Sequence, residues 1–295
     1  MMFRIPQDVN LVIQGTENAT QQSAVLSSSG NVGFTNSFTP KKALGNVVGI
    51  KFFLTLSATS GATAGSTTVG SAITNFKIRK GADIYLNVQS FAQFQRVYHM
   101  LTGLSWSDTT LTGTANGTAT ATMESPIIPV SYTLDVPIYI DFQFAPYTSL
   151  SPNFTGASVS GYVVFYYGQT DKNDKFIINT LPTALNANTD IDLFDYYADK
   201  HPIEYFWVDV QSDSNLNYLE YELGSTKVRD KMYATALIQF EDYLSLFSHV
   251  SGFFLTPMPY GVLATPSGSN VNAPKLIINL ANSVTPTIYT KVKVD

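Results

Sequence analysis

The sequence predicts an all-β protein made of two tandem β-sandwiches, each with one short helix. Three observations predict this fold class: a composition poor in charge, a series of short strand-like segments, and an order of elements that occurs twice. Charged residues make up 13% of the 295-residue chain, against a usual ~25%. Thr, Ser, Asn and Gly replace them, which is typical of β-proteins with uncharged loops. Low charge also suits a chain that buries surface against copies of itself, because interface cores are depleted in charge.

Short apolar segments recur along the chain, and most of them are typical of strands. They are rich in Val, Ile, Phe, Tyr and Thr, and Gly, Pro, Asn and Ser separate them. VPIYIDFQF (136–144) alternates, so that Val136, Ile138, Ile140 and Phe142 share one face. GYVVFYY (161–167) is apolar on both faces, as in a strand that is covered on both sides. The remaining segments are VVGIKFFLTL (47–56), AITNFKI (72–78), IEYFWVDV (203–210) and KLIINLA (275–281).

Two segments have helical spacing instead. In SFAQFQRVYHMLTG (90–103) the apolar residues recur every three or four positions, Ser90 and Gln93 form a capping box, and Gly103 can end the helix. TALIQFEDYLSLFS (235–248) has the same kind of apolar stripe. We expect both stripes to pack against a core, because core packing is the usual role of such a stripe.

The order of these elements repeats. IKFFLTL (50–56) resembles IEYFWVD (203–209), and ITNFKIRKG (73–81) resembles LNYLEYELG (216–224). In each half the Gly is followed by a strand-like piece, the predicted helix, another strand and a final strand. A repeat of this length indicates two whole domains.

The boundary between the domains is expected in the polar, turn-rich stretch GQTDKNDK (168–175), which gives domains 1–170 and 171–295. Each domain has about eight short strands, which is the size and strand count of a jelly roll, two sheets packed face to face. The predicted fold is therefore two tandem eight-stranded jelly-roll β-sandwiches, each with a short helix.

The first half contains two tracts that the second half lacks. They cover residues 59–72 and 105–123 and consist mainly of Ser, Thr, Gly and Ala. Small polar residues bury little apolar area, and insertions are tolerated at exposed loop tips. We expect both tracts to project from the first sandwich as loops.

The segments 73–81 and 216–224, each followed by an amphipathic helix, and the tandem layout of the whole chain resemble a known family. It is that of the double jelly-roll major capsid proteins of tailless icosahedral phages that enclose a membrane, the corticovirus and finnlakevirus type. The resemblance implies a structural protein, not an enzyme. Three copies would form a homotrimer whose six jelly rolls make a pseudo-hexagonal tile of the capsid. Its partners would be neighbouring trimers, other capsid and vertex proteins and the internal viral membrane, and its location the virion, after assembly in the host cytoplasm.

Catalytic and nucleic-acid-binding motifs are not apparent. The net charge is −5, whereas nucleic-acid-binding surfaces are basic, so no direct binding to nucleic acid is expected. The chain has no Cys and no G-x-S-x-G turn, and its Gly-rich tract lacks the Lys of a phosphate loop. We therefore expect no catalytic residue and no bound cofactor. His99 and His249 are expected at the polar margins of the helices. Two basic clusters are expected to be solvated strand faces: Lys77, Arg79 and Lys80, and Lys227, Arg229 and Lys231.

One acidic stretch is a candidate metal site. TDIDLFDYYAD (189–199) contains Asp190, Asp192 and Asp195, and hard oxygen ligands at this spacing could hold Ca²⁺. The stretch lacks the Gly and the Glu that an EF-hand loop needs at its sixth and twelfth positions. The alternative is an exposed connection that leads into the strand at 203.

Two other functions stay open from the sequence. A tandem β-sandwich that binds carbohydrate, or an adhesin, would expose some of the aromatic residues that make up 13% of the chain. Such a protein would be a monomer that binds glycans, whereas a capsid protein would self-assemble. An enzyme with a β-sandwich core is the third possibility, and the missing catalytic cluster counts against it.

Overall fold

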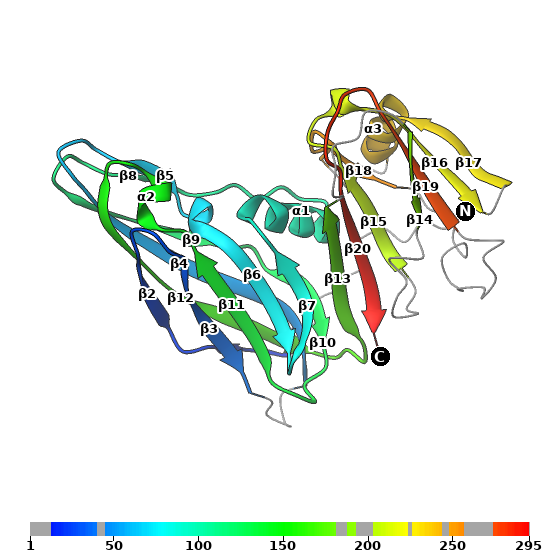
Figure 1. The fold of residues 1–295 in the computed structure, drawn as a ribbon. Coiled ribbons are helices and arrows are strands. Elements are labelled where there is room, and N and C mark those ends of the chain that lie inside the picture. Colours follow the sequence, from blue (N-terminus) through cyan, green and yellow to red (C-terminus); the bar gives the residue numbers. More distant parts are fainter. Residues whose placement is uncertain are drawn as a thin grey trace. The chain divides into compact units, whose positions relative to one another are not determined.

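The computed structural model describes most of the chain, in two compact units (Figure 1). The described residues are 13–39, 45–180, 188–192, 203–223, 226–243, 248–256 and 274–294. Of these, the residues up to 101 and residues 106–173 form the N-terminal unit, and residues 102–105 and those from 174 onward form the C-terminal unit. Because residues 102–105 group with the C-terminal unit, the units are not simple halves, and the division into 1–170 and 171–295 stays a prediction.

Two antiparallel sheets make up the sandwich of the N-terminal unit (Figure 1). The first contains β1 (Gly15–Asn18), β2 (Gln22–Leu26), β4 (Asn46–Ser60), β9 (Thr118–Glu124), β10 (Ile128–Tyr132) and β12 (Phe154–Gly168). Its order is β1-β12-β4-β10, with β2 also paired to β12 and β9 to β4. The second contains β3 (Val32–Phe38), β6 (Ile73–Lys80), β7 (Asp83–Val88) and β11 (Ile138–Phe144). Its order is β3-β11-β6-β7.

The C-terminal unit also has two antiparallel sheets. The first contains β13 (Asn173–Thr180), β15 (Ile203–Asp209), β18 (Phe253–Leu255) and β20 (Thr287–Val294), in the order β13-β20-β15-β18. The second contains β14 (Asn188–Asp192), β16 (Leu216–Leu223), β17 (Thr226–Tyr233) and β19 (Pro274–Leu280), in the order β14-β19-β16-β17.

The two units share one strand order. In the N-terminal unit, β1 and β2 both pair with β12, and β9 and β10 both pair with β4, so each couple occupies one strand position. One sheet of each unit then joins the first, eighth, third and sixth strands, and the other joins the second, seventh, fourth and fifth. This is the jelly-roll arrangement, and it confirms the fold class that the repeated order predicts. IKFFLTL lies in β4 and IEYFWVD is β15, the third strands of their units.

Strand alternation explains which residues enter the core. Ile138, Ile140, Phe142 and Phe144 on β11 are all buried, and the residues between them are not, as the period-2 pattern predicts. Val136 is the exception, because β11 begins only after Pro137, and it is exposed.

Aromatic rings tie the two sheets of the N-terminal unit together. Phe52 on β4 lies 5.9 Å from Phe76 on β6 and 5.5 Å from Phe142 on β11, measured between ring centroids. The Phe94 ring of α1 (Phe91–Thr102) is 5.4 Å away, and the Trp106 ring is 5.5 Å away. The stripe of α1 therefore packs on the core as predicted, and Trp106 belongs to that core.

Helix α1 begins with the predicted cap. The Ser90 hydroxyl accepts a hydrogen bond from the Gln93 N–H at 3.2 Å, and the Gln93 side-chain oxygen accepts one from the Gln89 N–H at 2.8 Å. In a standard capping box this second bond would return to the N–H of Ser90 itself. At the other end, Gly103 has φ +71°, the left-handed conformation that terminates helices.

Replacing Ser90 with alanine is expected to lower the free energy of unfolding by about 1 kcal/mol, because the Gln93 N–H loses its acceptor. Urea denaturation followed by circular dichroism would measure the loss. Ser90→Thr keeps a hydroxyl at the cap and is expected to retain most of the stability. Equal losses in both variants would contradict the capping role.

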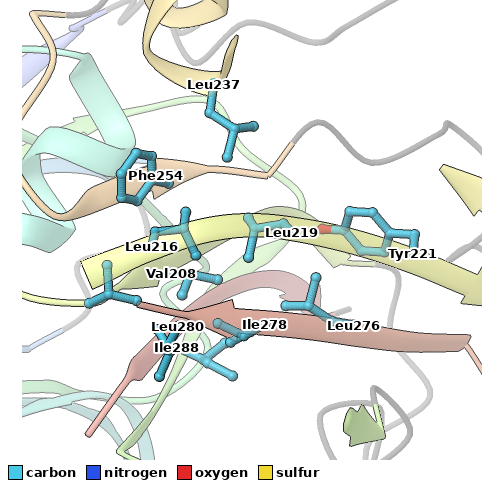
Figure 2. Close-up of a cluster of buried hydrophobic side chains, with 11 residues drawn as sticks. Val208, Leu216, Leu219, Tyr221, Leu237, Phe254, Leu276, Ile278, Leu280 and Ile288 are labelled. Atoms are coloured by element: carbon cyan, nitrogen blue, oxygen red, sulfur yellow. The ribbon is translucent and has the colours of Figure 1, made fainter. Parts of the chain in front are cut away.

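The core of the C-terminal unit is drawn in Figure 2. It joins side chains from both sheets to Leu237 of α3 (Ala234–Tyr243). The strand residues that form it are Val208, Leu216, Leu219, Tyr221, Phe254, Leu276, Ile278, Leu280 and Ile288, together with Val210 beside β15. The second predicted helix is thus confirmed up to Tyr243, and residues 244–247 lie outside the described part. Trp207 is fully buried, and its ring stacks on that of Phe253 with the centroids 4.7 Å apart.

The two Ser- and Thr-rich tracts are only partly exposed loops, at 61–65 and 113–117, so that prediction is wrong for the rest of their length. β5 (Ser66–Thr68) and β8 (Thr110–Thr112) pair with each other, and β9 pairs along β4. Val69, Leu111 and Met123 are buried within these tracts. Thr is β-branched and favours strands, and alternation with Ala and Met lets one side of the tract lie against the sandwich.

Candidate functional site

A face of small hydroxyl side chains covers the outer side of strands β12, β4 and β9. We call it the hydroxyl face, and it consists of Thr55, Ser57, Thr59, Thr118, Thr120, Thr122, Ser158 and Ser160. Thr55 lies opposite Thr122 and Thr59 opposite Thr118, each pair with hydroxyl oxygens 2.9 Å apart. Because a hydroxyl both donates and accepts hydrogen bonds, this uncharged surface is suited to contact with another polar protein surface. Its sequence signal is the alternation TATAT (118–122).

An aromatic stack lies at one end of the hydroxyl face. The rings of Phe53 and Tyr162 are stacked at 4.8 Å with an interplanar angle of 13°. The Lys51 ammonium lies 5.2 Å from the centre of the Phe53 ring and also forms an ion pair with Glu124. Lys51 and Glu124 are therefore the charged residues of β4 and β9 that lie nearest to the hydroxyl face.

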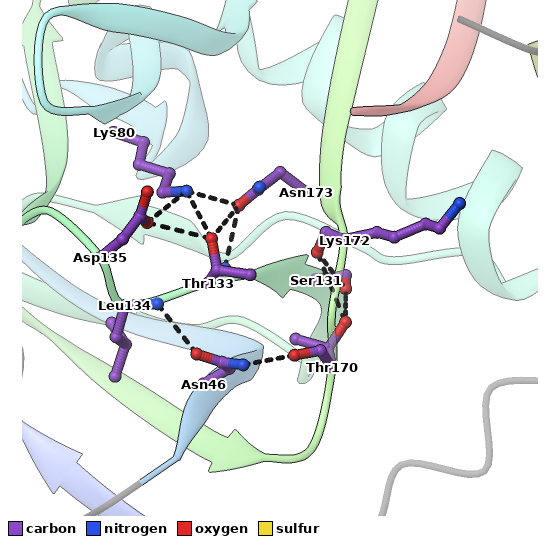
Figure 3. Close-up of polar contacts among 9 residues, drawn as sticks. All are labelled: Asn46, Lys80, Ser131, Thr133, Leu134, Asp135, Thr170, Lys172 and Asn173. Carbon is purple, nitrogen blue, oxygen red and sulfur yellow. Dashed lines mark hydrogen bonds and ion pairs between the residues drawn. The ribbon is translucent and has the colours of Figure 1, made fainter. Parts of the chain in front are cut away.

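A buried lysine lies at the end of β6, in the cluster of polar contacts in Figure 3. The Lys80 ammonium donates to Asn173 Oδ1 at 2.9 Å and to Thr133 Oγ1 at 2.5 Å, and it lies 2.5 Å from Asp135 Oδ1. Burial by itself would raise the pKa of Asp135, but the hydrogen bonds from Lys80 and Thr133 outweigh it and lower that pKa. The predicted solvated face is therefore wrong for Lys80, which is only 5% exposed. Its three acceptors compensate the buried charge.

In the same cluster, side chains of the N-terminal unit form hydrogen bonds with the segment that follows β12 (Figure 3). Asn46 donates to the Thr170 carbonyl and accepts from the Leu134 N–H at 2.9 Å. Ser131 donates to the Lys172 carbonyl at 2.8 Å. The segment 168–173, which has the composition of a free linker, is therefore bound to the N-terminal unit, and β13 begins at Asn173.

Another ion pair crosses the sheet of β3, β11 and β6. Arg79 donates to Asp141 through Nε at 2.5 Å and Nη2 at 3.0 Å, and Thr35 donates to Asp141 at 2.7 Å. Burial would raise the pKa of Asp141, but the hydrogen bonds from Arg79 and Thr35 prevail and lower it. The hydrogen bond to Asp141 also raises the pKa of Arg79. The pair connects three strands across one face, which is a structural role.

The predicted site residues are only partly described. Asp190 and Asp192 lie on β14, with their backbones opposite Ile277 and Lys275 on β19. Asp195 lies outside the described residues, so the calcium site stays a prediction. Among the residues that the structure describes, no group of three or more His, Asp or Glu side chains is arranged to hold a metal ion. His99 is 2% exposed, which corrects the expectation that it lies at a polar margin of its helix.

The helices of the described residues are too short or too polar to cross a membrane.

Comparison with known proteins gives a match in structure only. No family model and no curated protein sequence matches this chain. The STIV MCP matches with a TM-score of 0.64 and 12% identity, over 94% of this chain and 95% of that chain. The major capsid protein P2 from bacteriophage PM2 matches with a TM-score of 0.54 and 11% identity, over 93% of this chain and 97% of that chain. PBCV-1 VP54 matches with a TM-score of 0.57 and 11% identity, over 96% of this chain and 95% of that chain. The chain therefore has the double jelly-roll fold of these viral capsid proteins.

Proposed function

We propose that this chain is the major structural protein of a viral capsid and that it assembles as pseudo-hexagonal homotrimers. One observation carries the proposal: a single chain contains two jelly rolls of the same strand order, and capsid proteins align with it over nearly their whole length. Three such chains supply six similar sandwiches. Three-fold symmetry then produces a tile with nearly six-fold packing.

The surfaces of the units support self-association. β7 is an edge strand of the N-terminal unit and exposes Ile84, and β17 is an edge strand of the C-terminal unit and exposes Tyr233. Exposed sheet edges pair readily with other chains unless something covers or guards them. Charged residues commonly guard such edges; β17 carries Lys227, Arg229, Asp230 and Lys231, whereas β7 carries only Asp83 and is the less guarded edge. Contact with neighbouring copies would cover both the edges and the hydroxyl face.

The trimers would cover an icosahedral shell above an internal membrane, in the virion. Their partners would be neighbouring trimers, other capsid and vertex proteins, and the membrane surface. The role is structural, with no catalytic residue and no direct contact with nucleic acid. The tandem carbohydrate-binding alternative has no support among the similar structures named above, which are capsid proteins.

The oligomeric state tests the proposal. Native mass spectrometry and light scattering of purified protein at micromolar concentration are expected to show three times the 32.3 kDa chain mass. Electron microscopy of concentrated protein is expected to show hexagonal arrays or shells. A dilution series is the control, since a specific trimer dissociates over a narrow concentration range. A stable monomer without any lattice would contradict the capsid function.

A further inference from the structure

A histidine lies between two carboxylates in the C-terminal unit. His249 Nδ1 is 2.7 Å from Glu241 Oε2, and His249 Nε2 is 2.9 Å from Asp213 Oδ1. Glu241 belongs to α3, Asp213 to the short turn Asp213–Asn215 between β15 and β16, and His249 to the connection from α3 to β18. The imidazole thus joins three elements, and the Glu241 side chain is fully buried.

The same carboxylates hold the backbone of this connection. Glu241 Oε1 accepts the Leu255 N–H at 2.8 Å, and Asp213 Oδ1 accepts the Gly252 N–H at 2.7 Å. Gly252 has φ +76°, and a Cβ there would lie 2.3 Å from the Ser212 nitrogen, so the backbone at Gly252 packs closely against the turn that follows β15. Residues 248–255, which end with β18, are therefore held on the unit by contacts that include both carboxylates.

Hydrogen-bond chemistry fixes the number of protons that this arrangement needs. An ionised carboxylate only accepts hydrogen bonds, and a neutral imidazole has a single N–H. Neutral His249 could donate to one carboxylate only, and its other nitrogen would turn a lone pair toward the second. Both contacts become hydrogen bonds when one further proton is present, either on the imidazole or on Glu241.

The groups around His249 favour the form of the site that carries this extra proton. In the part of the chain that the structure describes, the charged groups that act on His249 are Glu241, from α3, and Asp213, from the turn. From β18, the apolar ring of Phe254 faces His249, with the two ring centroids 5.6 Å apart. Asp209, at the end of β15, accepts the Gln211 N–H at 2.8 Å. Burial by itself would lower the pKa of His249, but the hydrogen bonds to Glu241 and Asp213 outweigh it and raise that pKa above 6.5.

We propose that His249, Glu241 and Asp213 form a proton-dependent clasp that fastens residues 248–255 at neutral and mildly acidic pH and releases them at alkaline pH. The clasp depends on the fold of the C-terminal unit and not on the capsid function. In an assembled shell, alkaline pH would loosen this connection of the second jelly roll.

The direction of the pH dependence follows from the sign of each shift. The pKa of His249 is higher in the folded protein, so its stabilising contribution is complete below about 6.5 and is lost as pH rises through the folded value. Burial raises the pKa of Glu241, so its ionisation costs stability in the same direction. For Asp213, burial alone would raise the pKa, but the Gly252 and His249 hydrogen bonds lower it. Its contribution is therefore lost only on strong acidification.

Glu241→Gln provides the decisive comparison. Its amide can donate to His249 Nδ1, so a neutral imidazole makes both hydrogen bonds and no extra proton is needed. Hydrogen exchange of the peptide that spans 248–255 would be measured by mass spectrometry between pH 6 and 9 in the full-length wild type and in the variant. Comparing the two proteins at each pH removes the intrinsic pH dependence of exchange. The wild type is expected to lose protection relative to the variant by up to tenfold for each pH unit between the unfolded and folded pKa values of His249.

Histidine NMR gives an independent measurement on the wild type. The chain has three histidines, and His249→Gln would assign one of their resonances. The His249 signal is expected to titrate above pH 6.5. A midpoint at or below 6.5, or equal pH dependence of exchange in wild type and Glu241→Gln, would overturn the clasp. Since both readouts are local, either failure would leave the trimer measurement unaffected.

Discussion

Replacing Phe52 with alanine is expected to lower the free energy of unfolding by about 3–5 kcal/mol. The side chain is 1% exposed and contacts rings from both sheets of the N-terminal unit and from α1. Its removal leaves a cavity that these rigid rings cannot fill by small movements. Urea denaturation would measure the loss, and the nearby Trp106 ring supplies a fluorescence signal for the unit.

The neighbouring residue is a matched control for this experiment. Phe53 points to the opposite side of β4, where it is half-buried and stacks on Tyr162. Phe53→Ala removes the same number of atoms and is expected to cost less than half as much. Comparable losses in the two variants would show that Phe52 is not a central contact between the sheets.

Breaking the buried ion pair of Asp174 and Lys291 is expected to cost about 3–5 kcal/mol, because either single replacement removes a close partner of opposite charge from a group that stays buried. The two groups lie 3.4 Å apart in the C-terminal unit, and both side chains are almost fully buried. Lys291→Met and Asp174→Leu would be measured singly and together by denaturant unfolding. The double variant is expected to recover most of the loss, since neither of the two buried charges then remains. A double variant as unstable as the sum of the singles would contradict this explanation.

The duplicated fold could be predicted from the sequence because the type of each element, and so the order of elements along the chain, is encoded locally. Each strand has its own alternation, each helix its own spacing, and the cap at Ser90 lies within four residues of its partners. The matches between 50–56 and 203–209 then align two whole domains. The inferred function follows from this duplication, so it needed no catalytic motif.

The polar clusters could not be predicted in the same way. Lys80 lies in a basic stretch typical of solvated strands, and its partners Thr133 and Asn173 are 53 and 93 residues away in sequence. His249 meets carboxylates 8 and 36 residues away. Such pairings depend on how strand ends and turns converge after folding, and no spacing within one segment reveals them. The prediction for the Thr-rich tract failed for a different reason. Its small polar residues suggest a loop, although their alternation with Ala and Met is that of a strand.

The junction at Asn173 and Asp174 has a consequence for the order of folding. Asn173 is fixed by Lys80, and the next residue is fixed by Lys291. During synthesis the ribosome releases the N-terminal unit first, and closing the contact with Lys80 would anchor the first residue of β13 before the rest of its sheet exists. The nascent second jelly roll would then grow from an immobilised start. That lowers the chain entropy that β13 must lose when it pairs with β20, the last strand to emerge.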